Sequence, residues 1–198
     1  MIHDFIDLKE GINLVYGEAA TGKTTLALLL AYSYSKFSKV IFIDTENSFN
    51  TERFKQIAQE DYKKCLNNII TFKVEDFEEQ EKVIKKLNEI DASLIILDTI
   101  GMHYRVNLKE NFKEANVKIV EMLKTLRELN KNNVNVLITN QVYSNFKTND
   151  VESVGGKMIK KFCKVVIKLE KDPRKMLREK PNKVEKLFEI NNYGIILR

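Results

Sequence analysis

The residues with the clearest chemical meaning form a glycine-rich stretch near the start of the chain, Gly17-Glu18-Ala19-Ala20-Thr21-Gly22-Lys23-Thr24. In this spacing, Gly17 and Gly22 allow backbone angles that other residues resist, so successive N–H groups can turn inward around an anion. Lys23 can then reach the β- and γ-phosphates of a nucleotide, and the Thr24 hydroxyl can bind Mg²⁺. The stretch therefore predicts a phosphate-binding loop, with nucleotide-binding residues from Gly17 through Thr25.

The segments on either side of this loop must hold it in place. An apolar strand is predicted at residues 12–15, and an apolar helix is predicted at residues 24–34. The start of that helix adds the positive end of its dipole to the anion site. If the motif matched by chance, these residues would form a glycine-containing turn in which Lys23 has no role. The order of strand, loop and helix favours nucleotide binding instead.

A carboxylate ends a second apolar segment, at residues 94–98. A buried strand that ends in an aspartate has the form of the segment that orients Mg²⁺ through water in P-loop proteins. We therefore expect Asp98 and Thr24 to serve the same Mg²⁺ ion. The two motifs support each other.

Short apolar runs alternate with helical segments along the rest of the chain, which is typical of a parallel α/β sheet covered on both faces. Further strands are predicted at residues 40–44, 69–74, 134–139 and 165–169. Helices are predicted at residues 52–60, with Thr51 as the cap, at 77–90, and at roughly 112–130. Residues 187–197 have the pattern of a β-hairpin. The predicted fold is α/β, a mostly parallel twisted sheet flanked by helices, with a C-terminal β-hairpin.

Length and composition limit the kind of protein this can be. At 198 residues and 43% hydrophobic, the chain suits one well-buried domain, so we expect residues 1–198 to form a single domain. No stretch approaches the roughly 18 uninterrupted apolar residues of a membrane span, and the acidic start of the chain is unlike a signal peptide. We expect a cytoplasmic protein with no membrane partner. Cys65 and Cys163 lack metal-ligand spacing and are expected to be buried.

The formal net charge of +5 is unevenly distributed. Residues 157–198 hold 13 Lys or Arg against 5 Asp or Glu, a balance of +8, which leaves −3 for residues 1–156. Such an asymmetry is expected where one surface meets a polyanion. A solvated lysine face, or the charge-rich composition of a heat-adapted protein, would give the same count.

Two segments between predicted elements are candidate functional loops. Residues 99–111 follow the Asp98 strand, are predicted to be irregular, and contain His103, Tyr104 and Arg105. A lone histidine in a loop is more often a hydrogen-bonding bystander than a ligand, so His103 is given no role. The second loop, at residues 144–154, precedes two glycines and a short basic segment at 157–161.

Taken together, these segments resemble the RecA-family ATPases, and within them the recombinase branch of archaea and eukaryotes. The resemblance spans nearly the whole chain. Besides the glycine-rich loop, it rests on Ile43-Asp44-Thr45-Glu46, Thr51-Glu52-Arg53-Phe54, Leu97-Asp98, Ile138-Thr139-Asn140-Gln141-Val142, Gly155-Gly156 and Phe188-Glu189-Ile190-Asn191. It implies a RecA-type P-loop NTPase core with ATP and Mg²⁺ as cofactors, and without the helix-hairpin-helix domain of the full recombinases.

The resemblance also implies roles for individual residues. Glu46 matches the catalytic glutamate that polarises the attacking water, and Gln141 matches the residue that senses the γ-phosphate. Asp98 matches the carboxylate that holds the metal-bound water. Arg53 matches a residue that packs on the adenine face. Without the resemblance, Gln141 could be a hydrogen-bonding residue at a strand end, and Arg53 a surface charge.

Two departures from the family pattern bear on assembly. The loop between Gln141 and Gly155 is shorter than the family's second DNA-binding loop. The Phe-x-x-Ala polymerisation motif is not found ahead of the core, and the string Phe112-Lys113-Glu114-Ala115 begins a predicted helix, where coincidence explains it better. We therefore expect that this chain forms no filament alone.

The function implied by the resemblance is that of an ATP- and DNA-binding accessory protein of homologous recombination and DNA repair, with a weak ATPase. Its expected partners are single-stranded DNA, a Holliday-junction resolvase, and the main recombinase, which would be a RadA-like protein. Expected DNA contacts are Tyr104, stacked on a base, with Arg105, Lys157, Lys160 and Lys161. Two alternatives remain: a RecA-type regulatory ATPase that acts on protein partners, and a small-molecule kinase, whose arginine-rich lid has a counterpart only at residues 174–178.

Overall fold

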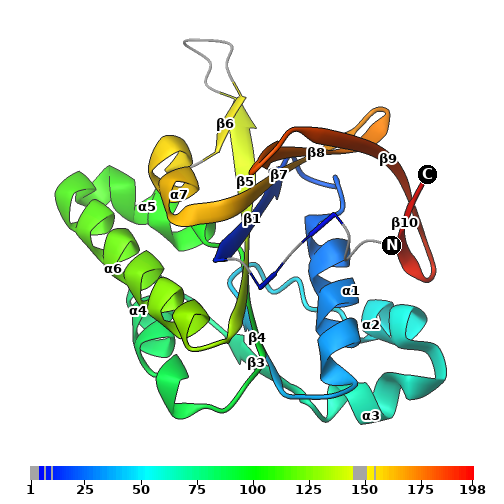
Figure 1. Cartoon of the computed structure of the whole chain (residues 1–198). Coiled ribbons are helices and arrows are strands. Elements are labelled where there is room, and N and C mark those ends of the chain that lie inside the picture. The colour runs from blue at the N-terminus through cyan, green and yellow to red at the C-terminus, as the bar shows by residue number, and fades with distance from the viewer. Residues whose placement is uncertain (1–4, 7, 10, 145–150, 154) are drawn as a thin grey trace.

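The computed structural model describes residues 5–6, 8–9, 11–144, 151–153 and 155–198. A ten-stranded sheet runs through this part of the chain, in the order β10-β9-β8-β7-β1-β5-β4-β2-β3, with β6 paired to β5. Helices cover both faces of its central part (Figure 1). None of the described helices is long and apolar enough to cross a membrane.

Parallel strands make up the centre of the sheet. They are β1 (Ile12–Gly17), β2 (Val40–Asp44), β3 (Ile69–Lys73), β4 (Leu94–Asp98), β5 (Asn135–Ser144) and β7 (Cys163–Lys171). Every residue of β1, β2 and β4 is buried, as the continuous apolar runs predict for strands covered on both faces. The register pairs Gly17 with Gln141 and Asp44 with Asp98, so the polar strand ends meet at one edge.

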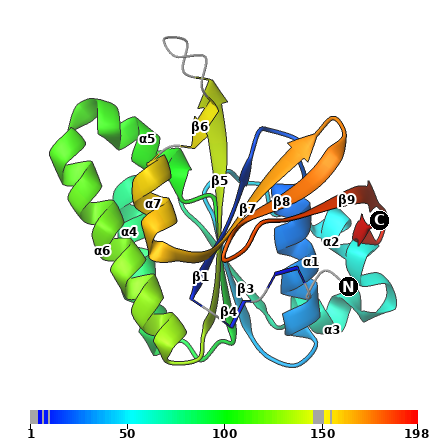
Figure 2. The same cartoon turned by 45° about the horizontal axis from the view of Figure 1, so that its top comes forward.

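The two faces of the sheet carry different helices (Figures 1 and 2). One face is covered by α1 (Lys23–Ser35), α2 (Thr51–Ala58) and α3 (Tyr62–Leu66), and the other by α4 (Phe77–Lys85), α5 (Gly101–Glu110), α6 (Phe112–Lys131) and α7 (Gly156–Phe162). Short 3₁₀ turns follow α2 at Gln59–Asp61 and α4 at Leu87–Glu89.

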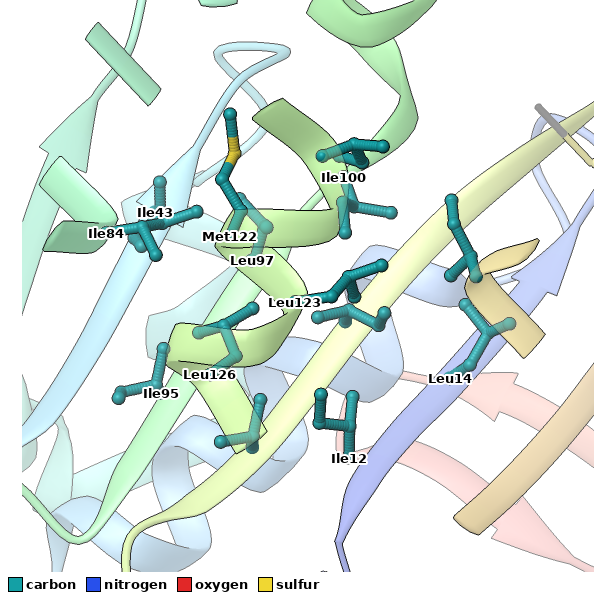
Figure 3. Packing of buried hydrophobic residues seen from close by; sticks show 14 of the residues in the cluster. Ile12, Leu14, Ile43, Ile84, Ile95, Leu97, Ile100, Met122, Leu123 and Leu126 are labelled. Atoms are coloured by element: carbon teal, nitrogen blue, oxygen red, sulfur yellow. The ribbon is translucent and has the colours of Figure 1, made fainter. Parts of the chain in front are cut away.

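Helix α6 shows how the helices pack on the sheet. Its buried residues are Ala115, Ile119, Met122, Leu123, Leu126 and Leu129, spaced so that they form one stripe along the helix. Figure 3 shows Met122, Leu123 and Leu126 of this stripe among the strand residues Ile95, Leu97 and Ile12. Each buried leucine or isoleucine contributes roughly 1.5–3 kcal/mol relative to an exposed one.

An antiparallel extension follows β7, formed by β8 (Arg174–Lys180), β9 (Val184–Asn191) and β10 (Gly194–Leu197). It curves over the side of the molecule that carries α1 (Figure 1). A Cβ on Gly194 would lie 3.3 Å from a methyl group of Leu29 in α1. The predicted hairpin is β9 and β10, whereas the sequence pattern does not predict β8. A second short hairpin is formed by β5 and β6 (Val151–Ser153).

The structure corrects several sequence expectations. Residues 99–111, expected to be irregular, contain the ten-residue helix α5. Strand β5 continues to Ser144, so the predicted loop starts later than expected, and residues 145–150 and 154 of that loop lie outside the described residues. Helix α2 is capped by the Asn50 side chain, which accepts a hydrogen bond from the N–H group of Arg53, and not by Thr51. Cys65 and Cys163 are buried and unbridged, as expected.

Candidate nucleotide-binding site

The glycine-rich loop connects β1 to α1, and its two glycines are required by their surroundings. Gly22 caps α1 in the left-handed region, with φ of 105°, which an L side chain rarely adopts. A Cβ on Gly17 would lie 2.4 Å from the carbonyl oxygen of Leu169 in β7, far inside van der Waals contact. The sequence motif is therefore matched by a backbone that only glycine fits.

Neighbouring side chains hold the rest of the loop. The Thr21 hydroxyl donates to the Glu18 carbonyl at 2.9 Å. Arg174, the first residue of β8, donates to the carbonyls of Ala20 at 3.2 Å and Thr21 at 3.4 Å. The Arg174 interaction could not be predicted, because nothing in the sequence indicates that β8 returns to the loop.

Lys23 lies at the centre of the loop with its side chain buried. Its ammonium donates to the carbonyls of Gly17 at 3.0 Å and Glu18 at 2.8 Å. Burial lowers the pKa of Lys23, while the nearby Asp98 and Glu46 carboxylates raise it. The buried ammonium suits a site that receives a phosphate, whereas the two carboxylates would require a cation such as Mg²⁺ to accompany it.

The predicted metal residues, Thr24 and Asp98, are brought together. Oδ2 of Asp98 accepts hydrogen bonds from the Thr24 hydroxyl at 2.8 Å and from the Ser48 hydroxyl at 3.0 Å. Its Oδ1 accepts a hydrogen bond from the Thr139 hydroxyl. Ser48 and Thr139 are not among the predicted site residues, although Thr139 follows the apolar run 136–138 within β5 and Asp98 follows the run 94–97 at the end of β4.

This set of oxygen atoms fits Mg²⁺, which prefers hard oxygen ligands and usually takes one or two from the protein and others from phosphates and water. In the described part of the chain, no group of three or more His, Cys, Asp or Glu residues could hold a metal. A Mg²⁺ ion at Thr24 and Asp98 would take its other ligands from water and from the phosphates of a bound nucleotide.

Glu46 and Gln141, the two residues expected to act on the γ-phosphate, contact each other directly. The Gln141 amide donates to both carboxylate oxygens of Glu46, at 2.8 and 3.0 Å, and the Thr99 hydroxyl donates to one of them at 3.1 Å. Burial raises the pKa of Glu46, and these hydrogen bonds oppose the increase. A carboxylate with a raised pKa is a better proton acceptor than an exposed one.

The segment that carries Glu46 is fixed by Asp44 at the end of β2. The Asp44 carboxylate accepts hydrogen bonds from the N–H groups of Ser48 and Phe49, each at 2.9 Å, and from that of Glu46 at 3.3 Å. Because Asp44 is buried, these hydrogen bonds attach the turn from Thr45 to Phe49 to the end of β2. The position of Glu46 is thus set by the neighbouring strand end.

These residues line one cavity of about 270 Å³. Its walls are Ala19, Ala20, Gly22, Lys23, Thr24 and Thr25 of the loop and α1, together with Glu46, Thr99, Gln141 and Ile190. The sequence-predicted phosphate, metal and catalytic residues therefore meet at the carboxyl ends of β1, β2, β4 and β5. Ile190 is a lining residue contributed by the C-terminal hairpin.

Arg53 lies beside that hairpin. Its guanidinium donates to the carbonyl of Asn191 at 2.7 Å and to the side chain of Gln56 at 2.8 Å. Asn191 directly follows the cavity residue Ile190. Arg53 is therefore near the hairpin side of the cavity, away from the residues expected to bind phosphate.

The expected DNA contacts are not brought together in the same way. Tyr104 is 1% exposed, its ring centroid lies 6.0 Å from that of Phe77, and its hydroxyl donates to Asn116 at 2.8 Å. Its expected stacking on a base is therefore wrong for this structure, because the ring belongs to the core. Arg105 is half-buried in α5, while Lys157 and Lys161 are exposed on α7. Lys160 is ion-paired with Glu179.

Comparison with known proteins agrees with this arrangement. The sequence matches the Rad51 family over residues 8–196. The chain belongs to the Rad51 family. Its fold is the RecA-type core that the sequence motifs predicted.

Within this family, the chain is similar to proteins called "DNA repair and recombination protein RadB". That of Methanocaldococcus jannaschii is 39% identical over 168 residues, which cover 81% of this chain and 78% of that protein. That of Methanosphaera stadtmanae is 33% identical over 93% of this chain and 87% of its own length. The solved "Crystal structure of the RadB recombinase" superposes with a TM-score of 0.79 at 30% identity and covers 93% of this chain and 89% of that one.

Proposed function

We propose that this Rad51-family protein binds ATP with Mg²⁺ and acts in DNA repair and recombination as an accessory to the main recombinase, a RadA-like protein. The observation that carries the proposal is the meeting of Lys23, Thr24, Glu46 and Gln141 around one cavity. Asp98 joins them through its hydrogen bond from Thr24. The names of its relatives supply the biological setting.

In this proposal, each part of the loop has a task. The backbone N–H groups of the loop and the start of α1 receive the phosphates, and the Lys23 ammonium exchanges its carbonyl partners for the β- and γ-phosphate oxygens. The Thr24 hydroxyl would bind Mg²⁺, and the Asp98 carboxylate would hold a water bound to that ion. When bound, Mg²⁺ neutralises charge on the phosphates. Arg53 and Ile190, which lie toward the C-terminal hairpin, are the proposed contacts for the adenine ring.

Hydrolysis would be slow for a structural reason. Glu46 is the proposed general base, but both of its oxygens accept hydrogen bonds from Gln141. Burial raises the pKa of Glu46, but these hydrogen bonds lower it and so weaken Glu46 as a base, and release of one oxygen by Gln141 would strengthen it. A γ-phosphate that attracts the Gln141 amide would cause that release, so Gln141 would link nucleotide binding to activation of the base.

Nucleotide binding tests the core of the proposal. Titration of a fluorescent ATP analogue with and without Mg²⁺ should show tighter binding with the metal, and Lys23→Ala should weaken binding about 100-fold or more. A suitable control is Lys55→Ala, because Lys55 lies on α2, where its ammonium is 5.3 Å from the Tyr62 ring centroid. Equal affinity in the wild type and Lys23→Ala would contradict the assignment of the loop.

DNA binding is the second part of the proposal, with Lys157, Lys161 and Arg105 as contacts. Lys157 and Lys161 are about one helical turn apart on α7, so their ammonium groups can face the same strand of phosphates. Replacing both with Gln should weaken binding of single-stranded DNA. It should also reduce the slope of log K against log salt by about one for each phosphate that the protein no longer neutralises. Fluorescence polarisation at several salt concentrations measures both quantities.

The burial of Tyr104 and the ion pair of Lys160 favour one alternative, a RecA-type regulatory ATPase that acts on protein partners. A pull-down with the main recombinase of the same cell, with and without ATP, separates the two functions when combined with the DNA measurement. Capture of the recombinase with no DNA affinity in the isolated protein would support the alternative. The same pull-down can include a Holliday-junction resolvase.

A further inference from the structure

Three polar side chains from distant parts of the chain meet on the α7 side of the sheet. The Tyr16 hydroxyl in β1 donates to Oε1 of Glu179 in β8 at 2.6 Å. The Lys160 ammonium in α7 donates to Oε2 of Glu179 at 2.7 Å and to the Tyr16 hydroxyl at 2.8 Å. We call these three residues the Tyr16 cluster. It joins one helix and two strands through three hydrogen bonds.

The electrostatics of the cluster are consistent with tight contact. The Lys160 ammonium also lies 4.0 Å from the centroid of the Tyr16 ring, within cation–π range. Burial raises the pKa of Tyr16, with a further contribution from Glu179, so the phenol stays a donor. Burial alone would raise the pKa of Glu179, but hydrogen bonds from Lys160 and Tyr16 lower it, so the carboxylate stays an acceptor.

The cluster adjoins the phosphate-binding loop directly. Tyr16 is the residue before Gly17, and the Gly17 carbonyl accepts a hydrogen bond from Lys23. Gly17 has almost no space to move toward β7, because its Cα already packs close to the Leu169 carbonyl. A shift of Tyr16 would therefore displace the start of the loop and the carbonyl that holds Lys23.

Helix α7 is the element through which such a shift could arise. It carries the exposed Lys157 and Lys161, the proposed contacts for a polyanion, on the same helix as Lys160. At its start, a Cβ on Gly155 would lie 2.8 Å from the Tyr104 ring, so this end of α7 is packed against the core. Because Lys160 contacts Tyr16 and Glu179, any displacement of α7 by a bound ligand would reach the Tyr16 cluster.

We propose that Lys160 is a positioning residue of the nucleotide site, which fixes the phosphate-binding loop to α7 through Tyr16 and Glu179. This proposal rests on the proposed function, because it assumes that the loop binds a nucleotide. It replaces the expectation that Lys160 contacts DNA. By linkage, a polyanion that changes the position of α7 changes nucleotide affinity, and a bound nucleotide changes affinity for the polyanion by the same factor.

The test measures nucleotide affinity in variants that break the cluster. Tyr16→Phe removes one hydroxyl and keeps the ring, and Lys160→Met removes the charge and keeps an apolar stem of similar length. Each should weaken binding of a fluorescent ATP analogue about three- to tenfold, because the loop must then be ordered at the expense of binding. The double variant should bind the nucleotide as tightly as the single variant with the lower affinity, because both substitutions disrupt the same group of hydrogen bonds. Lys160→Arg should restore most of the affinity.

The matched control is Lys175→Met. Lys175 lies in β8, as Glu179 does, and forms ion pairs with Glu170 at 3.2 Å and Glu185 at 3.4 Å. Neither partner belongs to the Tyr16 cluster. Loss of the Lys175 charge should leave nucleotide affinity unchanged. All affinities are measured well below the unfolding temperature of each variant, so that lost stability is not mistaken for lost positioning.

The possible results separate this proposal from the proposed function. A wild type that fails to bind the nucleotide contradicts the proposed function itself. If the wild type binds and Lys160→Met or Tyr16→Phe binds equally well, the positioning role is wrong. The positioning role is also wrong if Lys160→Met keeps nucleotide affinity and lowers the salt slope of DNA binding by about one, which is the signature of a phosphate contact.

Discussion

Replacing Glu46 with Gln is the sharpest test of the proposed hydrolysis, because it keeps the shape of the side chain and removes its charge. Glu46 accepts hydrogen bonds from Gln141 at 2.8 and 3.0 Å and from Thr99 at 3.1 Å. An amide at position 46 can keep some of these hydrogen bonds but cannot take a proton from water. General base catalysis contributes about 10²–10⁴-fold, so we expect hydrolysis to fall by that factor, or roughly 3–5 kcal/mol in activation free energy.

The same variant should change how stability depends on pH. Burial raises the pKa of Glu46 in the folded state, so the folded protein binds this proton more tightly than the unfolded chain does. The contribution of Glu46 to stability is therefore fully present below its unfolded pKa and is lost as the pH rises through the raised folded value. In Glu46→Gln this loss is absent, so the free energy of unfolding should decrease less across that pH interval than in the wild type.

Two measurements check this prediction. Phosphate release is followed at saturating ATP and Mg²⁺, with nucleotide affinity measured separately, and urea unfolding is followed at several pH values. Glu52→Gln, at an exposed position near the start of α2, is the control for loss of a carboxylate. Hydrolysis at the wild-type rate in Glu46→Gln would show that another group is the base. A fall matched by an equal loss of nucleotide affinity would show that Glu46 acts in binding.

Three further variants test other parts of the structure. Lys23→Ala should weaken ATP binding about 100-fold or more in a fluorescent titration, because two charge-assisted hydrogen bonds to phosphate are removed. Tyr104→Phe should lower the free energy of unfolding in urea by about 1 kcal/mol, because the hydrogen bond to Asn116 is lost. It should leave the affinity for single-stranded DNA unchanged in fluorescence polarisation. A loss of DNA affinity at constant stability would contradict the assignment of Tyr104 to the core. Gly17→Ala should cost about 1–3 kcal/mol in the same unfolding measurement and weaken ATP binding, because its Cβ would lie 2.4 Å from the Leu169 carbonyl.

The parts of the site that the sequence predicted are those that parallel strands position. Asp98 directly follows the apolar run 94–97, and Gln141 follows the run 136–138 after the two buried polar residues Thr139 and Asn140. Such runs form the buried central strands of a parallel sheet. Once the strands are parallel, their carboxyl ends share one edge of the sheet. The order β1-β5-β4-β2 then makes the ends that carry Glu46 and Asp98 neighbours of the loop that carries Lys23, and the local sequence pattern does not give this order.

The parts that the sequence did not predict depend on long-range packing. Within α5, only Gly101 and Tyr104 are buried, and the exposed Val106 interrupts any apolar stripe, so the segment lacks the pattern of an amphipathic helix. Strand β8 has one fully buried side chain, Met176, among charged residues. Its sequence resembles a solvated segment, and its place in the sheet comes from pairing with β7 of the central sheet and β9 of the antiparallel extension, which the local pattern does not indicate.

The charge count of the C-terminal third shows the same limit. Its balance of +8 suggested a polyanion surface, but the structure engages many of these basic side chains internally. Lys160 pairs with Glu179, Lys168 and Lys175 pair with Glu170, and Arg174 binds the phosphate loop. Such groups are held by the fold and would have to leave their present partners to bind a phosphate. Because a net charge counts held and exposed cations alike, only their positions in the fold distinguish the exposed Lys157 and Lys161 from Lys160, whose ammonium is held beside Tyr16.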